Sequence, residues 1–537
     1  MEKKNKAPSF VMNVITILFA QLFVKLLGFA YRMVITNIDG FGDMGNGYYN
    51  FGFQIYTLLL SISSIGIPNA ISKLVAERCA LDDFKGAMRI FRVALVLFSL
   101  VGLFFSGIMF FGAEFISTYI LDAPLAKYTI KVLSPAIIFV SVSSVIRGFF
   151  AGQQNMKATN TSQVLEQFLK SLTTILIVLA MAGAKPQYMA AGATLATTIS
   201  TLLSCIYLFI FYSCNKKSIK EKLTSAPAAK IKGNAIKIAK TILMVSVPIS
   251  LGAIVSSLNR VVDIVTVVRG VKIALASEFT NATALADEAV RLSGILSKTD
   301  VLVNLPLALN TAFSTVLVPT VAAAFAKKDY SAAESKISFS LLVSIVIALP
   351  CTAGYMALSG PIINMIYPNA TDGAWIFMTV APTVFFSAMS QTIYGSLQGM
   401  GKIFVPALSV LAGGVAKLIL NLLLIPIPSI NIYGAPISSI VCQAIAFFVS
   451  FFVLRKNLPM KLPFGRYFLR PFISAVVMAG CVIGFHTVMK PFIGNTFSTI
   501  ISIGLGAAVY FAMVISLKVF EKSELASLPL VGRFFRK

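Results

Sequence analysis

Long runs of apolar residues alternate along this chain with short polar segments. A membrane-spanning helix needs about 20 consecutive apolar residues, because the hydrocarbon core of a bilayer is about 30 Å thick. The sequence supplies such runs one after another, and the short links 184–187 and 426–431 make the helices on either side antiparallel neighbours. We therefore predict an all-α membrane protein with fourteen transmembrane helices, near residues 10–36, 48–72, 90–112, 127–150, 160–183, 188–213, 239–268, 298–325, 337–359, 373–397, 403–427, 432–454, 468–488 and 494–518.

Composition supports the same fold class. Of the 537 residues, 57% are hydrophobic and only 12% are charged, whereas soluble domains are about 45–50% apolar and about 25% charged. A soluble fold would have to cover this apolar surface with polar groups that the chain does not possess. We therefore expect a multi-pass membrane protein.

The placement of basic residues predicts the orientation. The first apolar run contains Lys25 and Arg32 and lacks a small-residue cleavage site, so it is a first transmembrane helix rather than a signal peptide. Cytoplasmic loops carry an excess of Lys and Arg. This rule places both termini in the cytoplasm, together with the basic segments 73–92, 216–240, 327–336, 455–470 and 518–537.

Several kinds of function are excluded by what the chain lacks. The net charge of +25 is spread between apolar runs without an aromatic and basic surface module, so we expect no nucleic-acid partner. A single histidine (His486) and six scattered cysteines without a CxxC pair argue against a metal site or a catalytic triad. No P-loop is present. We therefore expect neither an enzyme nor a cofactor, and energy from Na⁺, H⁺, the membrane potential or the substrate gradient.

The sequence also repeats itself. Matching features recur about 245 residues apart: Gln153–Lys157 with Gln398–Lys402, Lys170 with Lys417, Asp83 with Asp329, and Pro68 with Pro319. Helices 1–6 and 7–12 are therefore predicted to be two copies of one unit, related by an axis along the membrane normal. Helices 13 and 14 lie outside the repeat.

The repeat predicts a domain plan and a place for a substrate. We expect an N-terminal lobe at 1–214, a basic cytoplasmic linker at 215–240, a C-terminal lobe at 241–456, and helices 13 and 14 with a cytoplasmic tail at 457–537. Repeat-built transporters bind their substrates between the two repeats. The predicted arrangement is thus two lobes around a central cavity.

Charged residues inside membrane helices are costly and usually face a cavity or a partner. Six residues are predicted to line the substrate cavity: Lys25, Arg32, Gln54, Arg260, Lys298 and Asp300. Five more are predicted to couple an ion or to form charge pairs: Asp263, Lys417, Asn421, Glu166 and Lys170. The excess of cations predicts an anionic ligand, and a diphosphate suits the planar fork of arginine.

Less specific interpretations stand beside these assignments. Lys25 and Arg32 share a helix face, yet both could extend their side chains toward the interface. Arg260 and Asp263 could neutralise each other at a spacing of three, and Glu166 and Lys170 form the standard helix pair at a spacing of four. Arg147 is favoured as an interface anchor at the end of its helix.

Short motifs resemble a known family. They are Val24–Ala30 in the first helix, Gly66–Pro68 at the end of the second, Gly152–Gln154 after the fourth and Leu397–Gly399 after the tenth. They resemble the multidrug/oligosaccharidyl-lipid/polysaccharide exporter superfamily, and fourteen helices resemble its branch of lipid II flippases and stage V sporulation protein B. The resemblance spans nearly the whole chain.

The resemblance implies a V-shaped pair of lobes, alternating access and export of undecaprenyl-diphosphate-linked sugars, with helices 13 and 14 forming a groove for the lipid tail. Lys25 matches a cavity arginine of that family, whereas Tyr31, Gln54 and Val301 stand where flippases of Gram-negative bacteria have arginines. Some relatives hold sodium between helices 7 and 11. We hypothesise that the ammonium of Lys417 replaces that ion, paired with Asp263.

The leading prediction is a flippase for an undecaprenyl-diphosphate-linked sugar precursor, most directly lipid II for peptidoglycan synthesis. The alternatives are a flippase for a capsule or spore-envelope polysaccharide, a cation-coupled multidrug antiporter, and a non-transporting scaffold for envelope assembly. The expected partners are the lipid-linked oligosaccharide and membrane lipids, and the expected state is a monomer.

Overall fold

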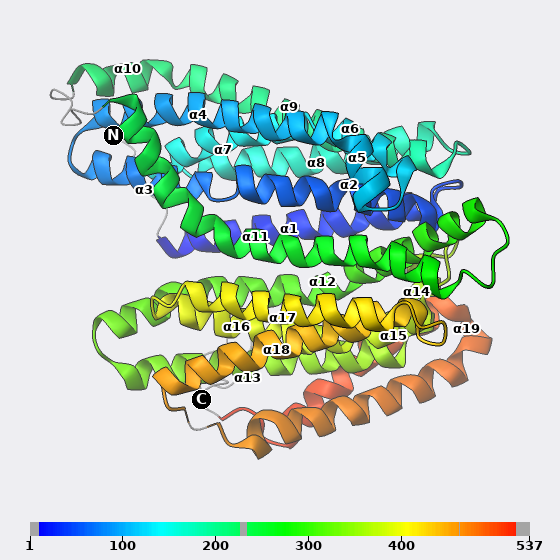
Figure 1. The fold of residues 1–537 in the computed structure, drawn as a ribbon. Helices are drawn as coiled ribbons and strands as arrows, with labels where there is room; N and C mark the ends of the chain where they lie inside the picture. Colours follow the sequence, from blue (N-terminus) through cyan, green and yellow to red (C-terminus); the bar gives the residue numbers. More distant parts are fainter. Residues whose placement is uncertain (1–9, 226–233, 461, 522–537) are drawn as a thin grey trace. The chain divides into compact units, whose positions relative to one another are not determined.

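The computed structural model describes residues 10–225, 234–460 and 462–521 (Figure 1). These residues form helices and no strands, which confirms the all-α prediction for the described part of the chain. Twelve of the helical segments searched are long and apolar enough to cross a membrane. The predicted cytoplasmic N-terminus, the centre of the basic linker and most of the predicted tail at 518–537 lie outside the described residues.

The chain divides into two compact units. Unit 1 consists of Met1–Arg269 and Asn281–Gly294, and unit 2 of Gly270–Thr280 and Ile295–Lys537. The helices α11 and α12 each contribute to both units. The lobes predicted from the repeat end at other positions, and they stay a prediction.

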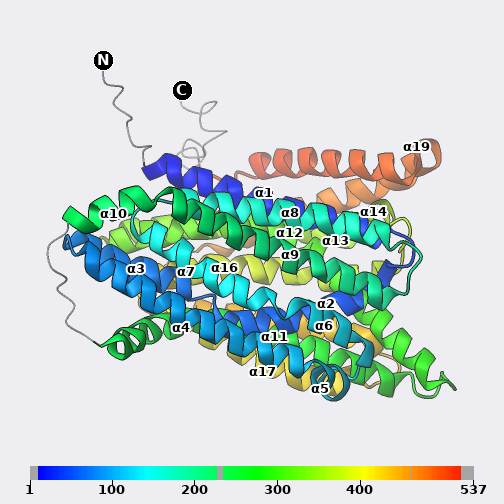
Figure 2. The same cartoon turned by 90° about the horizontal axis from the view of Figure 1, so that it is seen from above.

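Unit 1 contains the helices of the N-terminal half. Their bounds are α1 (Phe10–Thr36), α2 (Gly42–Ser63), α3 (Ile67–Ala80), α4 (Phe84–Phe111), α5 (Ala113–Phe115), η1 (Ile116–Ile120), η2 (Pro124–Ala126), α6 (Lys127–Leu133), α7 (Ala136–Gly152), α8 (Lys157–Ala180), α9 (Pro186–Cys214), α10 (Lys216–Ser225), and the first parts of α11 (Ala235–Ala274) and α12 (Ala282–Ala326). Helix α1 packs against α8, and the two lie side by side in Figure 2.

Unit 2 contains the remaining helices. Their bounds are α13 (Tyr330–Ala357), α14 (Ser359–Ile366), α15 (Ala374–Val380), α16 (Pro382–Gly399), α17 (Phe404–Leu424), η3 (Asn431–Tyr433), α18 (Gly434–Asn457), η4 (Gly465–Leu469) and α19 (Arg470–Ser516). Helices α17 and α18 pack closely together, as Figure 1 shows, and α19 packs against α13.

One break divides a predicted helix, and another lies where the predicted helices at 468–488 and 494–518 meet. The predicted helix at 48–72 is divided into α2 and α3, because the backbone leaves the α-helical pattern between Ser63 and Ile67. Gly66 in this break allows α11 to approach, since an added Cβ would collide with the side-chain oxygen of Ser250. In unit 2, Gly494 has a φ of 75° and interrupts α19. Only glycine adopts such a φ without strain.

The two halves share close helix contacts that reveal the register of the repeat. A Cβ added to Gly148 would lie 2.9 Å from the carbonyl oxygen of Pro68, and one added to Gly395 would lie 2.8 Å from that of Ser314. Glycine allows these backbones to meet. The equivalent positions are 246 or 247 residues apart, so Pro68 corresponds to Ser314. The predicted match of Pro68 with Pro319 is therefore wrong.

A second pair of glycines fixes the same register. Added Cβ atoms at Gly152 and Gly399 would lie 2.7 Å and 2.8 Å from the Cβ atoms of Val75 and Val321. The two glycines are 247 residues apart. The predicted match of Gln153–Lys157 with Gln398–Lys402 used a shift of 245 residues, so it was wrong by two residues. The polar residues of these two segments are a weaker guide to the register, because they are less constrained than glycines at close backbone contacts.

The repeat also duplicates a helix cap. The side chain of Asp83 accepts a hydrogen bond of 2.9 Å from the backbone of Gly86 at the start of α4. Asp329 accepts one of 2.9 Å from the backbone of Ala332 at the start of α13. Such caps satisfy an amide that has no partner within the helix.

We expect Asp329→Ala to lower the free energy of unfolding by about 1 kcal/mol, because the amide at the helix start loses its acceptor. Unfolding of the purified protein by SDS in mixed micelles measures this change. Asp329→Asn is the matched control, since asparagine caps helices equally well. If Asp329→Asn destabilised the protein as much as Asp329→Ala, the carboxylate would act through its charge and not as a cap.

Candidate cation-lined site

The site in unit 1 is built on one face of α2. Tyr49 and Phe53 are four residues apart, so they lie one turn apart on the same face. Their rings stack with centroids 5.7 Å apart. Asn50 and Gln54 are the next residues along the same helix, and the amide of Gln54 donates a hydrogen bond of 2.9 Å to the side-chain oxygen of Asn50. This face therefore presents two aromatic rings beside two amides.

Helix α1 contributes Arg32. Its side chain is buried, and its guanidinium lies 4.4 Å from the centroid of the Tyr49 ring. The hydroxyls of Tyr31 and Tyr49 are 3.1 Å apart and share a hydrogen bond. An aromatic face attracts a cation by about 0.5–2 kcal/mol without neutralising its charge. Arg32, predicted to line a cavity, is thus held by an aromatic face on α2.

Helix α8 contributes Lys170. Its ammonium lies 4.6 Å from the centroid of the Phe53 ring and 5.7 Å from that of the Tyr31 ring. Among the residues that the structure describes, no carboxylate forms an ion pair with Lys170. The positive charge of Lys170 is therefore positioned by aromatic faces and is not cancelled by a neighbouring acid.

Helix α11 contributes Arg260. Its Nε donates a hydrogen bond of 3.1 Å to the side-chain oxygen of Gln54, and its NH2 group donates one of 3.0 Å to the hydroxyl of Ser257. The side chain of Arg260 is exposed. Gln54, predicted as a cavity residue, therefore connects Arg260 to α2.

We call Arg32, Lys170 and Arg260 the unit 1 cation cluster. Three helices bring these cations to one face of α2, where rings and amides hold them. Opposite charges interact more strongly where water is scarce. A phosphate-bearing group that reached the cluster would gain charge-assisted hydrogen bonds, which are about twice as strong as neutral ones.

Lys25 lies two turns before Arg32 on α1. Its side chain is exposed. Its role as a cavity residue stays a prediction.

The pairing predicted between Glu166 and Lys170 is wrong. Glu166 instead forms an ion pair of 2.7 Å with Arg147 of α7. Arg147 also donates 2.9 Å hydrogen bonds to the hydroxyls of Ser162 and Ser204. Arg147 is buried, so its predicted role as an interface anchor is wrong as well. Helix spacing alone identified the neighbour on the same helix, whereas the stronger partner comes from another helix.

In unit 2, Lys298 is buried and anchors a loop. Its ammonium donates a hydrogen bond of 2.6 Å to the carbonyl oxygen of Ala370 and lies 5.6 Å from the Tyr367 ring centroid. Asp300 is exposed two residues later, and its carbonyl accepts a hydrogen bond from Asn304. Lys298 thus fixes the segment after α14. The substrate roles predicted for Lys298 and Asp300 stay predictions.

The predicted coupling residues of α17 are buried in unit 2. Lys417 is 7% exposed, and Asn421, one turn later, is 1% exposed. The hydroxyl of Ser438 on α18 donates a hydrogen bond to the side-chain oxygen of Asn421. Lys417 occupies the position equivalent to Lys170, at the shift of 247 residues. Asp263 is half-buried on the part of α11 in unit 1, and its coupling role stays a prediction.

The aromatic residues of the site were not among the predicted residues. The sequence signal for them is the spacing of Tyr49 and Phe53 within an aromatic-rich segment of α2. For metals, no group of three or more His, Cys, Asp or Glu side chains gathers among the residues searched in the structure.

Two curated proteins of Bacillus subtilis (strain 168) resemble the chain in sequence. Stage V sporulation protein B is 24% identical over 530 residues, covering 98% of each chain. Lipid II flippase MurJ is 25% identical over 420 residues, covering 75% of this chain and 74% of the flippase. These relatives confirm the predicted resemblance to the branch of lipid II flippases and stage V sporulation protein B.

A solved structure supports the fold. The lipid II flippase MurJ in an inward closed conformation matches with a TM-score of 0.69 at 17% sequence identity, covering 93% of this chain and 98% of that chain. The fold is therefore that of a MurJ-like transporter. The protein is a multi-pass protein of the bacterial inner membrane, and the relatives that it resembles are transport proteins rather than enzymes.

The family follows from a direct match to residues 10–325, which is more than half of the chain. This segment contains all three residues of the unit 1 cation cluster. The chain belongs to the family of polysaccharide biosynthesis proteins.

Proposed function

We propose that this protein is a flippase that moves an undecaprenyl-diphosphate-linked sugar precursor from the inner to the outer leaflet of the membrane. The observation that carries the proposal is Lys170, a cation within the membrane that rests on aromatic rings without a carboxylate partner among the described residues. The similarity to lipid II flippase MurJ supports lipid II as the first candidate substrate.

The proposed mechanism uses the cluster as a diphosphate site. The guanidinium groups of Arg32 and Arg260 suit two-pronged hydrogen bonds to phosphate oxygens. Lys170 adds a compact charge that its aromatic contacts leave available. Lys25 lies two turns before Arg32 on α1 and is proposed to guide the headgroup toward the cluster.

The topology of the proposal has fourteen spans with both termini in the cytoplasm. Twelve helical segments of the described chain are long and apolar enough to cross a membrane. Fourteen spans result if α1 is added and α19 is counted as two spans. Helix α1 is 27 residues long, and α19 is interrupted at Gly494. Two lobes at 1–214 and 241–456 would then enclose a central cavity that opens alternately to the two sides of the membrane. The protein is proposed to act as a monomer.

Coupling is proposed to use an ion gradient or the membrane potential. Lys417 supports this part of the proposal, because it is a buried cation beside Asn421 in unit 2. Its ammonium would take the place of a bound sodium ion, with Asp263 as the proposed counter-charge. If transport depended on sodium, persisted in Lys417→Ala and vanished in Asp263→Asn, this part would be contradicted.

A second candidate substrate is the lipid-linked precursor of a spore-envelope polysaccharide. The observation that favours it is the coverage of 98% in the match to stage V sporulation protein B, against 75% for lipid II flippase MurJ. The same cation cluster would serve either substrate, since both would carry a diphosphate. The two candidates differ in the sugar.

Complementation of a bacterium depleted of its lipid II flippase tests the proposal. We expect the wild-type chain to restore growth and Arg260→Ala to fail, because the cluster loses a phosphate ligand. Lys240→Ala is the matched control, since Lys240 is an exposed cation near the start of the same helix. Membrane amounts of all three proteins are compared by immunoblot.

The outcomes separate the alternatives. Failure of the wild type in this strain but rescue of a spore-envelope defect would favour the second candidate. A multidrug antiporter would instead confer drug resistance and require a carboxylate within the membrane. A scaffold without transport would function equally well in Arg260→Ala and in the wild type.

A further inference from the structure

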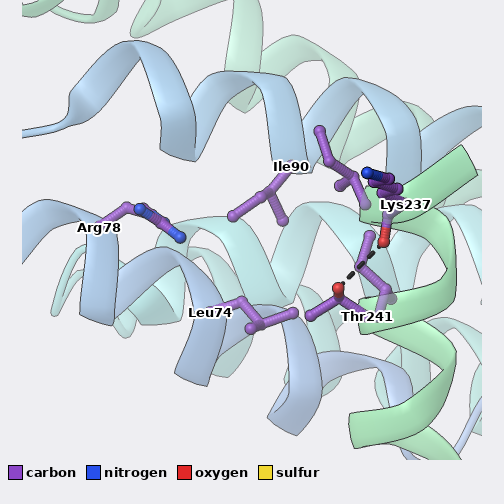
Figure 3. Close-up of a pocket in the computed structure, with 7 residues that line it drawn as sticks. Leu74, Arg78, Ile90, Lys237 and Thr241 are labelled. Carbon is purple, nitrogen blue, oxygen red and sulfur yellow. Dashed lines mark hydrogen bonds between the residues drawn. The ribbon is translucent and has the colours of Figure 1, made fainter. Parts of the chain in front are cut away.

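A pocket of ≈ 140 Å³ lies in unit 1 between α3, α4 and the first turns of α11 (Figure 3). Helix α3 contributes Leu74 and Arg78, and α4 contributes Ile90. The α11 residues that line it are Lys237, Ile238, Thr241 and Ile242.

The pocket combines an apolar interior with two cations. Ile90, Ile238 and Ile242 are buried and belong to the core cluster of α3, α4 and α11. Figure 3 shows Arg78 and Lys237 on opposite sides, with Leu74 and Ile90 between them. Such a lining suits an amphiphile that carries a negative charge. A free phosphate would gain nothing from the apolar interior.

The two cations differ in whether a carboxylate lies beside them. Arg78 lies 3.8 Å from the carboxylate of Asp83, whereas Lys237 forms no ion pair among the described residues. Lys237 also lies in the first turn of α11, where the positive end of the helix dipole adds to its charge. Lys237 is thus the stronger candidate to meet an anion.

The pocket lies close to the ends of membrane-spanning segments. Ile90 lies among the basic residues Lys85, Arg89 and Arg92, which precede the long apolar run of α4. The α11 residues that line the pocket lie at the start of that helix, where the predicted span at 239–268 begins. A phospholipid headgroup meets its acyl chains at such a level of the bilayer. Basic segments beside the membrane attract anionic lipids.

We propose that this pocket binds an anionic glycerophospholipid of the surrounding bilayer. Lys237 and Arg78 would bind its headgroup, while the glycerol and the first acyl carbons would pack on Leu74 and Ile90. Lys237 precedes Arg260 by 23 residues, or about 35 Å along a helix. The pocket is therefore separate from the unit 1 cation cluster, and the inference does not depend on the proposed substrate.

The bound lipid would also hold the linker region against unit 1. Ile219 of α10 belongs to the same core cluster as Ile238 and Ile242. The two helical parts of the basic linker, α10 and the start of α11, therefore belong to one core with α3 and α4 beside the pocket. A lipid in the pocket would add apolar contact and charge at this junction.

Native mass spectrometry of the full-length protein in a neutral detergent tests the inference, with phosphatidylglycerol and phosphatidylcholine as probes. We expect the wild type to bind phosphatidylglycerol more tightly than phosphatidylcholine. Lys237→Gln should lower the affinity for phosphatidylglycerol about fivefold, as expected for the loss of one cation near a charged lipid. The affinity for phosphatidylcholine should not change.

Two further variants make the test specific. Lys240→Gln removes an exposed cation one turn away that does not line the pocket, and it should leave the affinity unchanged. Thr241→Trp keeps every charge and fills the pocket, and it should lower phosphatidylglycerol binding. An equal loss in Lys240→Gln, or no loss in both Lys237→Gln and Thr241→Trp, would overturn the inference. So would displacement of phosphatidylglycerol by undecaprenyl diphosphate at equal concentration.

Discussion

Arg147→Met is expected to lower the free energy of unfolding by about 3 kcal/mol. The buried guanidinium binds Glu166 and the hydroxyls of Ser162 and Ser204, so its loss leaves a carboxylate and two hydroxyls without their donor. Removing one partner of a buried ion pair costs more than the pair itself contributes, because the remaining charge stays poorly solvated. Unfolding by SDS in mixed micelles measures the effect.

Two controls identify the cause of this loss. Arg147→Met combined with Glu166→Gln should recover part of the stability, since no unpaired charge remains. Tyr394→Phe changes the equivalent position of unit 2 by one hydroxyl and should cost no more than about 1 kcal/mol. Equal stability of Arg147→Met and the wild type would mean that water reaches Glu166 and that the ion pair contributes little.

Lys170→Met is expected to reduce transport at least tenfold while the protein remains folded. Methionine keeps the apolar contact with Phe53 and Tyr31 but removes the charge proposed to bind phosphate. A hydrogen bond to a charged group contributes about 1.5–3 kcal/mol, which corresponds to a factor of about 10 or more. Flipping of lipid II in proteoliposomes measures the effect if lipid II is the substrate, and the complementation test covers the cellular function.

The control for this variant lies on the same helix. Lys157 is an exposed cation at the start of α8, and Lys157→Gln should transport as the wild type does. Lys170→Arg retains the charge and should keep more activity than Lys170→Met. If Lys170→Met transported as well as the wild type, Lys170 would not belong to the proposed diphosphate site. Its contacts with aromatic rings would then be structural.

The sequence predicted the fold class because apolar length alone identifies membrane helices. It also predicted a cavity lined by Lys25, Arg32, Gln54, Arg260, Lys298 and Asp300, since charges within membrane helices seldom face lipid. The structure joins two of them, Gln54 and Arg260, by a hydrogen bond, and the role of the set in binding stays a prediction. It did not predict the break between α2 and α3. Local composition there does not distinguish a bent helix from two short ones, and the close approach of α11 to Gly66 joins parts of the chain that are far apart in sequence.

The partners of buried charges could not be derived from spacing along the chain. Glu166 has Lys170 one turn away, yet it binds Arg147 of another helix. The choice depends on which helices pack together, and one sequence does not reveal this. For the same reason the aromatic faces beneath Arg32 and Lys170 were missed, because cation–π contacts leave no fixed pattern along the chain.

The two halves of the chain share glycine contacts but differ in their buried polar groups. Where unit 1 holds Arg147 and Glu166, unit 2 has Tyr394 and Gly413 at a shift of 247 residues, and Gly413 lies close to the backbone of Cys442. The features that the two halves share are thus backbone contacts, whereas the interior charge of Arg147 and Glu166 belongs to unit 1 alone at these positions. After a gene duplication, either copy could exchange its interior side chains and acquire a new specificity without rebuilding its helix packing.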